Sequence, residues 1–164
     1  MIPRSAFTLL VGLTLALATA SARAADSDAV CNPGGTTTVA VALKAPAEQH
    51  LAGVRVTLDY PEKAVRIPGF ENRPEVQRRI SKIPPGFFIA PNDTDKELIV
   101  SLAGTTALPE GTIFAVEFDH CAGAPVTARE FHCTVDQASN EQAHLVDGAT
   151  CAATIAHDTT GGTP

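Results

Sequence analysis

The sequence predicts an all-β protein whose strands form an antiparallel sandwich or barrel. Residues 51–60 alternate between apolar and polar side chains, with Val54, Val56, Leu58 and Tyr60 on one side of the chain. An extended backbone sends successive side chains to opposite faces, so this run predicts a strand with one face in a core and one in water. Similar short runs recur, separated by Gly, Pro, Asn and Asp, and no helix of ordinary length is evident among them. Such spacing is typical of sandwiches and barrels.

The expected strands follow one another with short connections. Tyr60 ends the core-facing series of the second run, so its ring is expected to be packed, and Pro61 stops the strand. In residues 111–120, Phe114, Val116 and Phe118 are expected to face inward, and Ile113, Ala115, Glu117 and Asp119 outward. The expected strands are residues 37–43, 51–60, 64–67, 86–90, 97–103, 111–120, 129–135 and 149–155.

The segment of residues 72–83 fits two structures. Val76, Ile80 and Ile83 stand at helical spacing, with a proline early in the segment and another just after it, as in a short helix. An irregular edge strand would fit the same residues, and both alternatives stay open.

The first 24 residues have the layout of a secretory signal peptide. Arg4 gives a positive start, residues 7–20 are almost wholly apolar, and Ala22-Arg23-Ala24 supplies a cleavage site. The apolar run is too short to span a bilayer, which takes about 18 residues or more. The protein is therefore expected to be secreted or periplasmic, with no membrane insertion. The expected organisation is a signal peptide over residues 1–24, one domain over residues 25–157 and a flexible tail over residues 158–164.

The charge balance argues against two classes of partner. Loss of Arg4 and Arg23 with the signal peptide changes the formal net charge from −6 to −8, with 10 basic and 18 acidic residues left. Nucleic-acid affinity rests on Lys and Arg side chains that neutralise phosphates. An anionic membrane surface would repel an acidic chain in the same way. Neither nucleic acid nor a membrane is expected as a partner.

All four cysteines, Cys31, Cys121, Cys133 and Cys151, lie in the exported part. An even number in an oxidising compartment predicts two disulfides, with three possible connectivities. We favour Cys121–Cys133, which closes a short loop between successive strands, and Cys31–Cys151, which ties the ends of the domain together. A histidine precedes two of these cysteines, but a zinc site would need thiolates, and export favours disulfides.

Three stretches of the chain resemble cohesin domains. Residues 51–65 are similar to the cohesin signature, a strand that ends near Tyr, a Pro-containing turn and a short apolar return. Residues 97–119 resemble a later hairpin of that family, and residues 125–140 and 146–155 resemble its last two strands. The resemblance implies an antiparallel jelly-roll sandwich of about nine strands, related to the carbohydrate-binding modules of cellulases, in which one sheet face docks a dockerin module. The shared motifs are apolar alternation and turns, which indicate a fold family rather than an activity.

One polar strand face is the candidate binding surface. In a sandwich, Arg55, Thr57 and Asp59 share an outward face with Ile99 and Ser101. The resemblance implies that these strands form the sheet that cohesins use for docking. A mixed, lightly apolar sheet surface suits a modest protein partner, although a plain solvated face would show the same pattern. Further candidates on this face are Glu130, His132 and Thr134.

A cluster of oxygen ligands is the candidate metal site. Asn92, Asp93 and Asp95 lie in an expected loop and, with Glu97, could contribute to a calcium site, which takes six to eight hard oxygens. The alternative is an acidic turn stabilised by Asx hydrogen bonds. No other cofactor is expected.

No catalytic motif is found, and the protein is not expected to be an enzyme. No G-x-S-x-G elbow surrounds a serine. Glu110, Glu117 and Asp119 are available, but a number of carboxylates alone does not indicate glycoside cleavage. Sugar binding through a flat aromatic platform is weakly supported, because the chain has no Trp and one Tyr. Of the adjacent Phe87 and Phe88, only one can face the core.

These observations predict a non-catalytic, secreted binding module. By the resemblance, its partner would be an extracytoplasmic protein, a dockerin-like module or another, bound through an outer sheet face. The alternatives are a carbohydrate-binding module that binds a polysaccharide during polysaccharide breakdown, and a structural envelope or matrix protein.

Overall fold

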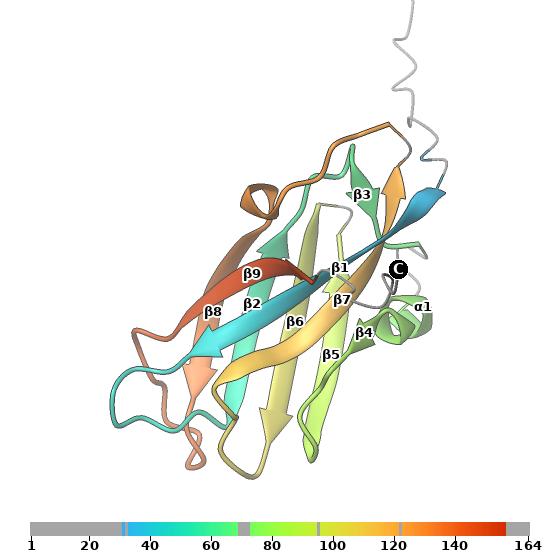
Figure 1. Cartoon of the computed structure of the whole chain (residues 1–164). Coiled ribbons are helices and arrows are strands. Elements are labelled where there is room, and N and C mark those ends of the chain that lie inside the picture. Colours follow the sequence, from blue (N-terminus) through green and yellow to red (C-terminus); the bar gives the residue numbers. More distant parts are fainter. Residues whose placement is uncertain (1–30, 32, 69–72, 95, 122, 157–164) are drawn as a thin grey trace, which may run out of the picture.

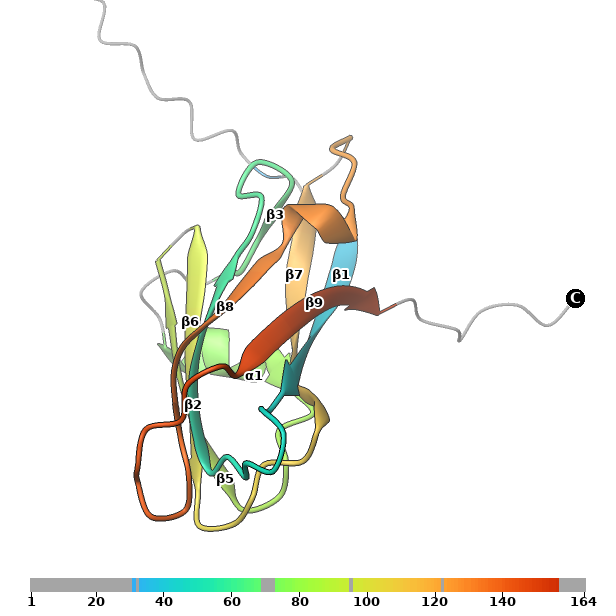
Figure 2. The same ribbon diagram turned by 90° about the vertical axis from the view of Figure 1, so that its left-hand side faces the viewer.

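The computed structural model describes residues 31, 33–68, 73–94, 96–121 and 123–156. These residues form two antiparallel sheets that stack as the layers of a β-sandwich-like fold (Figures 1 and 2). The predicted all-β class is confirmed. The expected signal peptide over residues 1–24 and the expected tail over residues 158–164 lie outside the described residues. The strands are β1 (Pro33–Lys44), β2 (Gly53–Asp59), β3 (Val65–Arg66), β4 (Ile80–Ser81), β5 (Phe87–Asp93), β6 (Glu97–Gly104), β7 (Gly111–Cys121), β8 (His132–Ser139) and β9 (Thr150–Ala156).

Each layer has its own strand order. In the described part of the chain, the five-stranded sheet has the order β3-β7-β1-β9, and β4 pairs with β7 beside this path. The four-stranded sheet has the order β5-β6-β2-β8. Sequence neighbours β1 and β2 therefore lie in different layers, and each is an inner strand of its sheet. This explains why both carry a fully buried apolar face.

The segment of residues 72–83 contains both of the structures that its sequence allows. Residues Arg73–Arg78 form the short helix α1, and Ile80–Ser81 form β4 directly after it. Val76 is 2% exposed and Ile80 is 7% exposed, while Ile83 is only partly buried against the core. The helical spacing applies only to Val76, because Ile80 lies in β4. The helix ends because Ile80 pairs with Val116 of β7.

The core lies between the layers and is rich in aliphatic residues, with a group of aromatic rings at one end. The Tyr60 ring is 6% exposed, as predicted, and its centroid lies 5.0 Å from that of Phe118. The Phe131 ring also packs against Phe118, with 5.6 Å between the ring centroids. The largest side chains that are almost fully buried include Phe114, Phe118, Leu51, Leu58, Leu98 and Ile113.

The outward face of β7 is more buried than its sequence predicts. Ile113 and Ala115 are 0% exposed, and Asp119 is 9% exposed. The reason is that β7 is an inner strand, with β1 on one side and β3 and β4 on the other. From the segment before β4, Arg79 reaches over it: the Arg79 Nη1 lies 2.7 Å from Glu117 Oε1 and 3.1 Å from Asp119 Oδ1. Alternation gave the direction of these side chains but not their burial.

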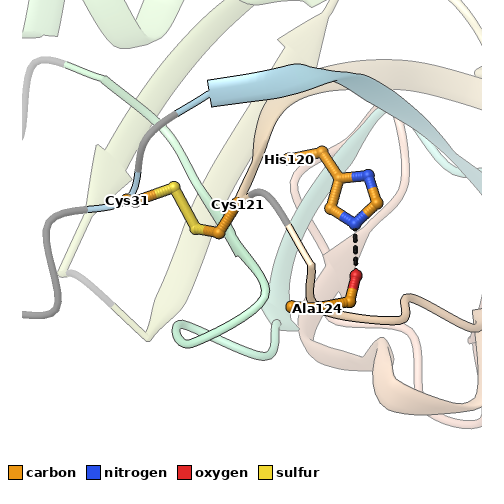
Figure 3. Close-up of a disulfide and its surroundings, with 4 residues drawn as sticks. All are labelled: Cys31, His120, Cys121 and Ala124. Carbon is orange, nitrogen blue, oxygen red and sulfur yellow. Dashed lines mark hydrogen bonds between the residues drawn. A yellow bond between two sulfur atoms is a disulfide. The ribbon is translucent and has the colours of Figure 1, made fainter.

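The predicted disulfide connectivity is wrong. The structure joins Cys31 to Cys121 and Cys133 to Cys151, in place of Cys121–Cys133 and Cys31–Cys151. Antiparallel pairing sets Pro33 opposite Cys121, so Cys31 arrives beside the end of β7 with a Cα–Cα distance of 4.8 Å (Figure 3). Cys133 and Cys151 lie on the edge strands β8 and β9, and their disulfide joins the two layers. The prediction of two disulfides is confirmed.

The approach to β8 contains a turn that the sequence analysis assigned to a strand. Ala128–Glu130 form one turn of 3₁₀ helix, η1, and β8 begins only at His132. The Thr127 N–H donates to Glu130 Oε2 at 2.7 Å, and the Thr127 hydroxyl donates to the same oxygen at 3.0 Å. Glu130 therefore belongs to this turn and not to the strand face on which it was expected.

Candidate functional site

The candidate site is the outer face of the four-stranded sheet, opposite the core. All five residues predicted for it lie together: Arg55 stands opposite Ser101, Thr57 opposite Ile99, and Asp59 follows on the same strand. Val54, Val56 and Leu58 of β2 lie in the core and are 0–4% exposed. Because successive side chains of a strand point to opposite faces, Arg55, Thr57 and Asp59 point outward. Pairing extends this surface to β5 and β8. We define the outer face by Phe88, Ala90, Asn92, Ile99, Ser101, Ala103, Arg55, Thr57, Asp59, His132, Thr134, Asp136 and Gln137.

A polar cluster lies on the β2–β8 side of the outer face. The Thr57 hydroxyl donates to Asp136 Oδ2 at 2.7 Å, and the Arg55 Nε lies 3.9 Å from the same oxygen. Both charged side chains are substantially exposed, so this ion pair contributes little stability. The Thr57–Asp136 hydrogen bond is what orients the Asp136 carboxylate on the exposed sheet.

Asp136 reaches the outer face through an irregularity in β8 that sequence reasoning missed. The pairing register shifts between Arg55 and Val56: Arg55 faces Gln137, whereas Val56 faces Val135. Asp136 is the extra residue of this bulge, and its carboxylate lies beside the side chain of Thr57. The sequence signal was weak, because two consecutive polar residues, Asp136 and Gln137, only interrupt the alternation.

An exposed aromatic ring lies on the β5 side of the outer face. Phe88 is 82% exposed, and it stands opposite Ala103 of β6. Its neighbour Phe87 faces the other way and packs against the core, as the adjacency of the two rings required. The small side chains of Ala90 and Ala103 leave the Phe88 ring raised above its surroundings. A large exposed apolar ring on a sheet is the kind of residue that anchors a partner.

The structure does not bring the proposed calcium ligands together. Asn92 and Asp93 are consecutive residues of β5, so their side chains point to opposite faces. Asn92 is exposed, while Asp93 is 7% exposed and its Oδ1 accepts a hydrogen bond from the Tyr60 hydroxyl at 2.7 Å. The third proposed ligand, Asp95, lies outside the described residues. Among the residues described, no cluster of three or more His, Cys, Asp or Glu side chains could hold a metal ion.

A pocket of about 610 Å³ lies beside the outer face and was not predicted. It shares Asp59 with that face, and its lining comes from three separate connections, which is why no single stretch of sequence indicated it. The lining combines an apolar part with charged groups of both signs. Its residues include Tyr60, Pro61, Pro125, Lys63, Lys96 and Glu130.

No family model matches the sequence, and a search of curated proteins finds no match. Within the part of the chain that the structure describes, no helix has both the length and the apolar character needed to cross a membrane.

Proposed function

We propose that this protein is a non-catalytic, exported binding module with a cohesin-like jelly-roll fold, and that its outer face recognises an extracytoplasmic protein. The observation that carries the proposal is the composition of this face. An aromatic ring that is 82% exposed stands on the same surface as a polar cluster in which Thr57 donates a hydrogen bond to Asp136 and Arg55 forms an ion pair with it.

The arrangement suits a protein partner for a physical reason. Affinity at protein interfaces is concentrated in a few well-packed anchors, and polar groups around them set orientation and specificity. Phe88 provides the anchor, because its ring is the largest apolar group that this face leaves in water. The polar cluster provides donors and acceptors whose positions are already held, which lowers the entropy cost of binding.

The chain's chemistry supports an extracytoplasmic partner. Two disulfides are consistent with an oxidising, extracytoplasmic location, and residues 1–24 have the layout of a signal peptide. The cohesin resemblance indicates a dockerin-like module as the first partner to test. The two-layer antiparallel fold is compatible with that family, but a shared fold does not by itself assign a function.

The test is capture of partners from the extracytoplasmic proteins of the source cells, followed by affinity measurement with the captured protein. Phe88→Ala should weaken binding at least tenfold, which corresponds to about 1.4 kcal/mol. Arg55→Glu should also weaken binding, because the new carboxylate would repel Asp136 and disrupt the polar cluster. The comparison variant is Leu145→Ala, since Leu145 is also a large exposed apolar residue, at 68%, and is not one of the residues that define the outer face; it lines a pocket with Asp136 and Gln137 at the β8 edge of that face. Parent-like affinity of the Phe88→Ala variant would exclude the outer face as the binding surface.

Carbohydrate binding is the second candidate, and the same ring favours it. An exposed aromatic ring between small neighbours can stack on the apolar face of a sugar. Here the expected result is retention of the protein on an insoluble polysaccharide, and loss of retention in Phe88→Ala but not in Leu145→Ala. If the Phe88→Ala variant is retained on the polysaccharide as well as the Leu145→Ala variant, this result would argue against carbohydrate binding through Phe88.

A further inference from the structure

The free edge of β9 differs from the other sheet edges in the described part of the chain. β9 is the last strand of the five-stranded sheet and pairs only with β1 there, without a register shift from Thr150 to Ala156 (Figure 2). Its seven residues, TCAATIA, contain no charged residue and no proline. No backbone hydrogen bond to the other side of this strand is found among the described residues.

The remaining edges carry features that natural sheets use to prevent pairing with another chain. In the four-stranded sheet, β5 contains Pro91 and has α1 near it, and β8 has a bulge at the charged Asp136. At the far edge of the five-stranded sheet, β3 and β4 have two residues each. Charge, proline, bulges and short length thus protect three edges. β9 has none of these features, and the elements near it, apart from its partner β1, are β8 and η1, as α1 is near β5.

A second observation concerns the inward side chains of β9. Ala153 and Ile155 pack against the core but are only half-buried. Their partners across the β1 pairing, Val41 and Val39, are 0% exposed. An additional strand beside β9 would cover this apolar surface and also satisfy the free backbone groups of the edge.

We propose that β9 pairs antiparallel with β9 of a second copy of this chain, which joins the five-stranded sheets of two molecules. The strand has only small, uncharged side chains, apart from Ile155, so it offers no charge by which a different sequence could be selected. β9 of a second copy is also uncharged, so no side-chain charges oppose the pairing. In a dimer with a two-fold axis, the same edge of each copy pairs with that of the other. Strand addition of this kind takes its affinity mainly from main-chain hydrogen bonds.

The pairing would be weak and favoured by salt. Seven residues at about 3.4 Å each give an edge of about 24 Å. One pair of strands of this length buries less surface than the interface of a stable dimer. The expected charge of each exported copy is −8, so two copies repel one another through the solvent. Salt screens this repulsion but leaves main-chain hydrogen bonds largely unchanged. The dimer would leave both outer faces uncovered, since these belong to the other sheet of each copy.

The test is sedimentation of the purified exported protein from about 20 μM to about 1 mM, a range in which weak interfaces become populated, at low and high salt. The average mass should rise towards that of a dimer with concentration, and more at high salt. Thr154→Lys should weaken the dimer at least tenfold, because Thr154 is exposed in the monomer and a lysine there puts like charges near each other in the pair. The matched control is Thr106→Lys, which makes the same charge change at an exposed loop residue and should dimerise like the parent.

A second measurement does not depend on any variant. Amide hydrogen exchange at Ala152–Ala156 of the parent protein should slow as its concentration rises, while exchange in β5 and β8 should not change. A chain that stays monomeric throughout, a Thr154→Lys variant that dimerises like the parent, or open-ended assembly would each overturn the proposal. Protection of β9 by an added peptide in a chain that stays monomeric would assign the edge to another partner and overturn it as well.

Discussion

At the residue scale, Arg79 is the side chain with the clearest electrostatic role. Its Nη1 lies within 3.1 Å of both the Glu117 and the Asp119 carboxylates, and Asp119 is 9% exposed. Two neighbouring carboxylates on one strand face repel each other unless a cation lies between them. The adjacent Arg78 differs, because it is exposed and contacts only Glu75 of its own helix among the described ion pairs.

We therefore predict that Arg79→Gln destabilises the protein by about 1–3 kcal/mol, since it leaves Asp119 partly desolvated beside Glu117 without a cation. The matched variant Arg78→Gln should change the free energy of unfolding by less than about 0.5 kcal/mol, as is usual for exposed ion pairs. Urea unfolding of both variants measures the difference. Equal losses would show that the Arg79 bridge has no special role.

At the scale of elements, the two disulfides connect the strands differently. Cys31–Cys121 joins the residues before β1 to the end of the neighbouring β7, and 90 residues separate the two cysteines. Near this bond, a ring nitrogen of His120 lies 2.6 Å from the Ala124 carbonyl oxygen and tightens the turn that leaves β7 (Figure 3). Cys133–Cys151 joins edge strands of different layers, with a separation of 18 residues. Only the second bond links the layers directly.

Removing each disulfide should therefore have a different effect. In the chain-entropy model, loss of Cys31–Cys121 costs about 5 kcal/mol and loss of Cys133–Cys151 costs about 3 kcal/mol. The Cys133→Ala/Cys151→Ala variant should nevertheless show the faster amide exchange in β8 and β9, because these edge strands lose their connection. Chemical denaturation and hydrogen exchange test the two parts. Peptide mapping that found Cys121 linked to Cys133 would contradict the connectivity itself.

At the scale of the whole molecule, an aromatic group connects the layers. Phe118 belongs to the five-stranded sheet and packs against both Tyr60 and Phe131, which adjoin the paired strands β2 and β8 of the four-stranded sheet. The Tyr60 hydroxyl also donates to Asp93, so one end of the sandwich combines ring packing with a buried hydrogen bond. The two sheets therefore share one core and should unfold together.

Phe118→Ala is expected to lower the free energy of unfolding by about 3–5 kcal/mol, because it opens a cavity where the layers meet. The transition should remain single when it is followed by circular dichroism and by tyrosine fluorescence. Phe88→Ala serves as the comparison, since this ring is 82% exposed and its loss should cost less than about 0.5 kcal/mol. Two separate transitions in the parent protein would contradict a shared core.

Much of the fold could be predicted because strand periodicity is local. Alternation identified β2 and β6 and placed Arg55, Thr57 and Ser101 on one face, since side-chain direction follows from the extended backbone alone. The same rule did not show that Ala115 would be buried, because burial depends on which strands lie alongside. The bulge at Asp136 was missed for a related reason: a one-residue shift in register is decided by the partner strand.

By itself, the sequence determined the all-β class, most of the strands, the inward and outward directions of their side chains and the presence of two disulfides. These properties depend on residues close together in the chain and on the number of cysteines. Only the tertiary structure decided which cysteines pair, how Arg79 covers β7 and which sheet edge remains unprotected. Each of these depends on the order of strands within a sheet, and that order brings together residues that are distant in sequence.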